Sequence, residues 1–90
     1  YKEALKYLGK ALKIRIAIFG EEHPDVAISY NNVGGELKQL GYHNKALEHQ
    51  QKALEMQLRM FGEKHHIVAI SYNNVGNTLA LFDRNEEALE

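Results

Sequence analysis

Two kinds of side chain in this 90-residue sequence could do chemistry: five histidines, and two pairs of adjacent asparagines. The spacing of the histidines does not predict a metal site, because no two stand four residues apart and no cysteine is present to complete a ligand set. No nucleophile motif and no glycine-rich phosphate loop appears in the sequence. The sequence therefore predicts no catalytic residue, no metal site and no cofactor, and we do not expect the protein to be an enzyme.

The asparagine pairs Asn31-Asn32 and Asn73-Asn74 have the clearest binding chemistry. A carboxamide is both a donor and an acceptor, which suits hydrogen bonds to the backbone of an extended peptide whatever its sequence. Asparagine is also a poor helix former, so two in a row in the middle of a helix lower its stability unless they serve a purpose. We therefore favour contact with a ligand. The alternative is that these side chains bond within the scaffold and fix the spacing of neighbouring helices.

Both pairs belong to a repeat. The nine residues from Val26 to Gly34 return unchanged from Val68 to Gly76, at an offset of 42 residues. The same offset aligns Phe19-Gly20-Glu21 with Phe61-Gly62-Glu63. A period of about 20 to 50 residues is typical of a solenoid of stacked structural units.

The hydrophobic pattern predicts helices throughout. Apolar residues recur at steps of three and four, whereas the alternation typical of a strand is absent. Glycine is expected to end helices at Gly20 and Gly62, and Pro24 to begin one. The predicted helices span 1–19, 24–40, 45–61 and 66–82, with a turn at Asp83-Arg84-Asn85 and a short fifth helix at 86–90. The predicted fold is all-α, an α-solenoid of antiparallel helix pairs.

The second and fourth predicted helices each carry one inward stripe. Beside each stripe lies a glycine, Gly34 or Gly76, at which a neighbouring helix is expected to approach closely. The residues predicted to face inward are Val26, Tyr30, Val33, Leu37 and Leu40 on one helix, and Val68, Tyr72, Val75, Leu79 and Phe82 on the other.

Composition narrows the possible partners. With a net charge of -1, 44% apolar and 26% charged residues, the chain has no strong attraction for nucleic acid, and its apolar runs are too short to span a membrane. Absence of cysteine is compatible with a cytoplasmic location.

We divide the chain into the second helix of a preceding repeat at 1–20, a complete repeat at 24–62 and an incomplete one at 66–90. Without polar caps, such an array is expected to self-associate through its ends.

The helix pair around Gly34, Ala46 and Ala53 resembles the tetratricopeptide repeat. Gly34 to Ala46 is twelve residues and Ala46 to Ala53 is seven, as in the signature of that family. The 42-residue period, with the motifs Phe19-Gly20-Glu21-Glu22-His23-Pro24 and Asn31-Asn32-Val33-Gly34, looks like the kinesin light chain and nephrocystin type. The resemblance implies a superhelix that binds a protein segment in its concave groove.

The first helix of each pair mainly lines that groove. The resemblance implies that Asn32 and Asn74 contact the main chain of a bound peptide. We further expect Ile28, Ile70 and Leu81 to offer apolar pockets for its side chains. The full set of candidate peptide-binding residues is Ile28, Asn31, Asn32, Gly35, Ile70, Asn73, Asn74, Asn77 and Leu81. The alternative function is a structural spacer or regulatory array attached to a catalytic or nucleotide-binding domain elsewhere in the parent chain.

Overall fold

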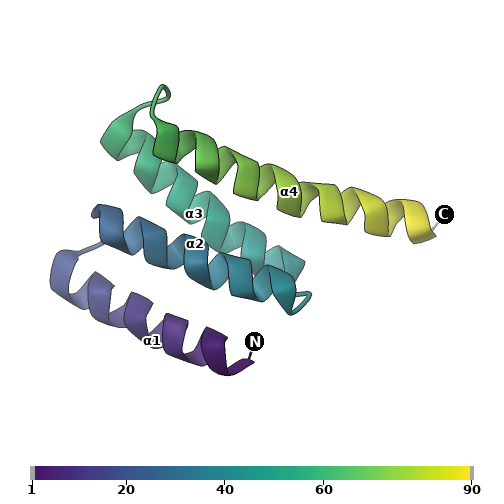
Figure 1. Ribbon diagram of the computed structural model, residues 1–90, viewed down its shortest axis with the longest axis horizontal. Helices are drawn as coiled ribbons and strands as arrows, with labels where there is room; N and C mark the ends of the chain where they lie inside the picture. The colour runs from purple at the N-terminus through teal and green to yellow at the C-terminus, as the bar shows by residue number, and fades with distance from the viewer. Residues whose placement is uncertain (1, 90) are drawn as a thin grey trace.

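The chain folds into four helices. The computed structural model describes the backbone of residues 2–89 and the side chains of residues 2–82. The helices are α1 (Lys2–Phe19), α2 (Pro24–Gln39), α3 (His43–Phe61) and α4 (His66–Leu89), and the described backbone contains no strand. Successive helices run antiparallel and follow one another across a slab with extents of 46 × 34 × 15 Å (Figure 1). The all-α prediction is confirmed.

The connection between α1 and α2 spans residues 20–23 and depends on Gly20 and His23. Gly20 has a φ of +78°, in the left-handed region that favours glycine, and its N–H donates to the Ile16 carbonyl at 2.8 Å. The ring of His23 stacks on that of Phe19 with centroids 4.1 Å apart. His23 Nδ1 also accepts the N–H of Asp25 at 3.1 Å, so the imidazole acts as the N-cap of α2.

The connection between α3 and α4 repeats this arrangement. Gly62 has a φ of +81°, the rings of Phe61 and His65 stack at 4.5 Å, and His65 Nδ1 accepts the N–H of Ile67 at 3.1 Å. Two of the five histidines are therefore helix caps. They recur because the turn is built the same way in each repeat.

Three predicted boundaries differ from the structure, the first of them because α2 ends at Gln39 rather than at 40. Gly41, with a φ of +89°, ends the turn after α2, and α3 begins at His43 rather than at 45. The turn expected at 83–85 and the separate fifth helix are wrong, since α4 continues to Leu89. The repeat places Asp83 where the first copy has Gly41, so the residue that adopts a positive φ is missing.

The apolar core lies where α1, α2 and α3 meet. Its buried members include Leu12 of α1, Val26, Val33 and Leu37 of α2, and Met56 of α3. Fully burying one such side chain contributes about 1.5 to 3 kcal/mol. The inward stripe predicted on α2 is therefore confirmed at these three positions, while Tyr30 and Leu40 of that stripe are half-buried.

The stripe predicted on α4 is only partly buried. Val68 and Val75 are buried against α3, but Tyr72 is 50% exposed and Leu79 is 44% exposed. Within the described residues no later helix packs on this side of α4, which leaves these two side chains in solvent. The close approach expected at Gly76 is wrong for the same reason, because a Cβ there would have no neighbour within 4 Å.

Polar side chains hold α4 on α3. Gln50 and Gln57 of α3 are each 2% exposed, although the sequence pattern gave no reason to bury them. The Thr78 hydroxyl donates to Gln50 Oε1 at 2.6 Å, and the Ser71 hydroxyl donates to Gln57 Oε1. Because buried polar groups must be paired, these contacts make the burial of both glutamines possible.

Candidate functional site

A hollow of about 280 Å³ lies between α2 and α4, with α3 behind it. We call it the α2–α4 hollow. Ile28 and Ile70, which are repeat equivalents, stand on its two sides and are 46% and 47% exposed. The other lining residues are Asn31, Asn32, Gln57, Ile67, Ser71 and Asn74. The structure thus brings together five of the nine candidate residues from two helices.

Asn31 is partly engaged in the scaffold. Its Nδ2 donates to Ser71 Oγ at 3.1 Å, and Ser71 in turn donates to Gln57, so a hydrogen-bonded chain joins α2, α4 and α3. The other polar atom of this carboxamide, Oδ1, is buried and has no partner among the described residues. Asn31 therefore fixes the spacing of helices, as the scaffold interpretation expects, and retains one free acceptor.

Asn32 and Asn74 have more freedom. Asn32 is exposed and Asn74 is half-buried, and neither carboxamide forms a hydrogen bond among the described residues. Apart from the backbone bonds of the helix, the hydrogen bond at Asn74 among the described residues is one in which its carbonyl accepts the Thr78 hydroxyl at 3.1 Å. Both side chains are thus available to exchange hydrogen bonds with a bound molecule.

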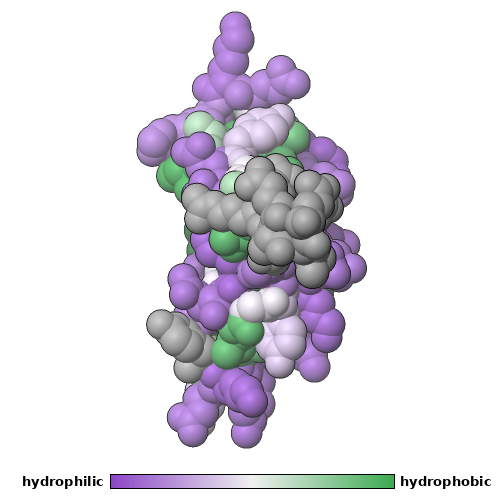
Figure 2. Space-filling view, turned by 90° about the vertical axis from the view of Figure 1, so that its right-hand side faces the viewer, coloured by the Kyte–Doolittle hydropathy of each residue, from purple (hydrophilic) through white to green (hydrophobic). Residues whose placement is uncertain are grey.

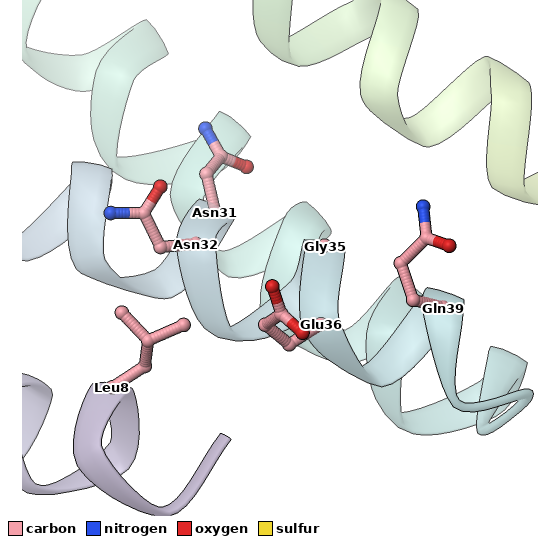
Figure 3. Close-up of a pocket in the computed structure, with 6 residues that line it drawn as sticks. All are labelled: Leu8, Asn31, Asn32, Gly35, Glu36 and Gln39. Carbon is pink, nitrogen blue, oxygen red and sulfur yellow. The ribbon is translucent and has the colours of Figure 1, made fainter. Parts of the chain in front are cut away.

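A second hollow, of about 470 Å³, lies on the other side of the asparagine pair. We call it the α1–α2 hollow. Leu8 rises from α1 on one side, and the remaining lining residues all come from α2 (Figure 3). They are Asn31, Asn32, Gly35, Glu36 and Gln39. Since Asn31 and Asn32 line both hollows, the two are neighbours on one surface.

Three candidate residues lie elsewhere. Asn73 and Asn77 are exposed and Leu81 is half-buried, and none of the three lines either hollow. Conversely, sequence reasoning missed Gln57, Ile67 and Ser71 in one hollow and Leu8 and Glu36 in the other. Ser71 carried a usable signal, because it and Ser29 recur at the repeat offset and are both buried.

The face on which α1 begins and α2 ends is mainly polar. Figure 2 shows this face covered by hydrophilic side chains, with hydrophobic surface in small separate patches between them wherever side chains are described. None of the described helices is long and apolar enough to cross a membrane. No group of three potential metal ligands gathers within residues 2–82.

Charged contacts concentrate behind the hollows, between the first connection and α3. Arg59 Nη2 lies 2.6 Å from Glu22 Oε1, and Lys52 Nζ lies 3.5 Å from Glu21. The hydrogen bond from Arg59 lowers the pKa of the Glu22 carboxyl below its usual value. Burial raises the pKa of Tyr30, with a smaller effect from the nearby Glu21. None of these groups lines the two hollows.

The chain matches the tetratricopeptide repeat family model over residues 1–59 and again over 37–90, which together span the whole sequence. It belongs to the tetratricopeptide repeat family. Repeats of this family are generally protein-interaction modules without catalytic activity. A search of curated proteins gives no match.

Proposed function

We propose that this repeat array binds an extended segment of a partner protein across the α2–α4 hollow. The observation that carries the proposal is that two repeat-equivalent pairs, Ile28 with Ile70 and Asn32 with Asn74, line one hollow. Apolar walls flanked by carboxamides suit an extended peptide, because the walls accept side chains and the carboxamides pair with the main chain.

Affinity for a peptide tests the role of the asparagines. Peptides selected from a displayed library on the 90-residue chain serve as probes. The double variant Asn32→Ala with Asn74→Ala should weaken their binding by about 1 to 3 kcal/mol in total, with the melting temperature unchanged. The matched control is Asn73→Ala with Asn77→Ala, which removes two exposed carboxamides of α4 that line neither hollow and should leave the affinity unchanged.

Selectivity tests the role of the isoleucines. Main-chain hydrogen bonds are common to all peptides, whereas side-chain pockets differ in what they accept. Ile28→Ala and Ile70→Ala should therefore reorder the peptide panel, while the asparagine variants should weaken all peptides alike. Lower stability with unaltered affinity in the asparagine double variant, measured where it remains folded, would overturn the proposal.

A structural spacer is the second candidate function. The series of hydrogen bonds from Asn31 through Ser71 to Gln57 favours a spacer role, since one candidate binding residue already bonds within the scaffold. Under this alternative the asparagine variants lower the melting temperature and the display selection gives no peptide that binds in the α2–α4 hollow.

The finer family assignment is also a proposal. We place the chain with the kinesin light chain and nephrocystin type on its 42-residue period and its Phe-Gly-Glu-x-His connections. The stacked rings and imidazole caps of both connections support a repeat type defined by this motif. A cytoplasmic location is proposed on the cysteine-free composition alone.

A further inference from the structure

The α1–α2 hollow is lined by a carboxylate that has an oxygen without a hydrogen-bond donor. Glu36 Oε2 and Asn31 Oδ1 are both buried, and neither has a partner among the described residues. Both residues line this hollow. A buried acceptor without a donor is costly in free energy, so the Glu36 carboxylate in the lining of this hollow is suited to a donor supplied from outside.

The repeat shows why Glu36 lacks a partner. At the offset of 42 residues, Leu8 and Glu36 correspond to Gln50 and Thr78. In the later pair, the Thr78 hydroxyl donates to Gln50 and both residues are satisfied. In the earlier pair the carboxylate of Glu36 replaces the hydroxyl, and Leu8 replaces the glutamine. Leu8 has no polar side-chain atom to offer. The first copy therefore has an unmatched negative charge where the second has an internal hydrogen bond.

The charge of the hollow defines what it accepts. Glu36 is the only charged side chain among the described residues that line it, and none of them is basic. Asn31, Asn32 and Gln39 add carboxamide oxygens, which are further acceptors. A guanidinium group carries five donors in a planar fork that pairs with a carboxylate in two parallel hydrogen bonds, whereas an ammonium group offers a compact point charge.

We propose that the α1–α2 hollow binds a basic side chain, arginine in preference to lysine, from the protein segment held in the α2–α4 hollow. This inference rests on the proposed function, because the basic residue belongs to the bound segment. Asn31 and Asn32 line both hollows, so a segment that crosses them presents an apolar side chain on one side and a basic side chain on the other. Glu36 is thus the specificity-determining residue of the array for charge.

A titration with a single amino acid tests the hollow without any peptide. N-acetyl-arginine amide is added to the isotope-labelled 90-residue chain, and the amide signals of Gly35 and Glu36 are followed by NMR. The control probe is N-acetyl-citrulline amide, which has nearly the same shape without the charge. We expect saturable shifts with arginine and at least about fivefold weaker binding with citrulline, the size of a charge-assisted hydrogen bond.

Three variants locate the effect. Glu36→Gln keeps the size of the side chain and should weaken arginine binding at least about fivefold. Leu8→Gln places at this position the side chain that Gln50 has in the later repeat. Gln50 accepts there through Oε1, whereas the Nε2 amide of the new glutamine can donate to the Glu36 carboxylate, so this variant should also weaken binding. Glu48→Gln, which removes an exposed carboxylate of α3 that does not line this hollow, should change nothing. Circular dichroism identifies the variants that are folded.

Equal binding of arginine and citrulline, or unchanged arginine affinity in folded Glu36→Gln, would overturn the proposal. These outcomes are distinct from failure of the proposed function, which is read from the effect of the Asn32 and Asn74 variants on selected peptides. In the peptide panel, Glu36→Gln should remove a preference for arginine while leaving the contribution of Asn74 intact.

Discussion

The segments 26–34 and 68–76 have identical sequences and different surroundings. One side of each segment is buried alike, since Val26 and Val68 are both 0% exposed. This side faces the preceding helix, α1 for α2 and α3 for α4. The identical residues are buried equally there because both helices have a predecessor to pack on.

The other side of the segments differs. Ala27 is buried whereas Ala69 is exposed, and a Cβ added to Gly34 would meet Gln50 Cγ at 2.8 Å whereas one on Gly76 would meet nothing within 4 Å. This side faces the helix that follows, which only α2 has within the described residues. The comparison shows that identical residues are equally able to pack, and that they are buried only where a neighbouring helix covers them.

The largest expected effect comes from enlarging the two glycines. Gly34→Leu should destabilise the protein by about 3 kcal/mol, since the new side chain collides with α3 at Gln50 and at the Ala46 carbonyl, 3.2 Å from the added Cβ. Gly76→Leu should instead stabilise it by about 0.5 to 1 kcal/mol through better helix propensity. Urea unfolding of both variants gives the two values, and a similar loss in both would break the comparison.

The paired valines should respond equally. Val26→Ala and Val68→Ala each remove two methyl groups from a fully buried position, so each should cost about 2 kcal/mol. Thermal and urea unfolding measure the cost. A difference of more than about 1 kcal/mol between the two, well beyond the scatter expected for like sites, would show that the preceding helices do not bury this side equally.

The smallest expected effect concerns the first connection, where Glu22 stands at the position of Lys64 in the second. Because Arg59 lowers the folded-state pKa of Glu22, the unfolded state binds a proton more readily. This contribution to stability is complete above the ordinary glutamate pKa of about 4.3 and is lost as pH falls through the lower folded-state pKa.

Urea unfolding between about pH 6 and pH 2 measures this dependence. The variant Arg59→Gln should show a shallower decline in stability on acidification than the parent chain. Glu63→Gln, at a residue of the second connection that makes no ion pair within the described residues, serves as the control and should leave the slope unchanged. If the stability of Arg59→Gln declined with falling pH as steeply as that of the parent chain, the acid sensitivity would come from other carboxyl groups.

Periodic apolar residues predicted the helices themselves, and the residues at their ends predicted most boundaries, because helix ends depend on local chemistry. Gly20 and Gly62 end helices at positive φ, and Pro24 begins one, as expected. The turn at 83–85 failed because polar composition alone does not break a helix when no residue there readily adopts a positive φ. The predicted burial of Tyr72 was wrong because an aromatic side chain is buried only where a neighbouring helix covers it, and no described helix does so here.

The candidate site was predicted in part. Repeat spacing indicated Ile28, Asn32 and Asn74, since equivalent positions of stacked helices share one surface. It did not indicate Gln57 or Glu36, because a glutamine or glutamate in a helix normally reads as solvent-exposed. Only the packing of α3 on α4 and of α1 on α2 shows which polar residues face a neighbour.

The two glutamine–hydroxyl contacts between α3 and α4 also have a mechanical consequence. The two contacts are seven residues apart on each helix, about two turns. The earlier glutamine, Gln50, pairs with the later hydroxyl residue, Thr78, as antiparallel packing requires. Sliding one helix along the other by a single turn, about 5.4 Å, breaks both contacts at once and leaves the two buried glutamine side chains without these partners. The two contacts therefore hold α4 in one register on α3.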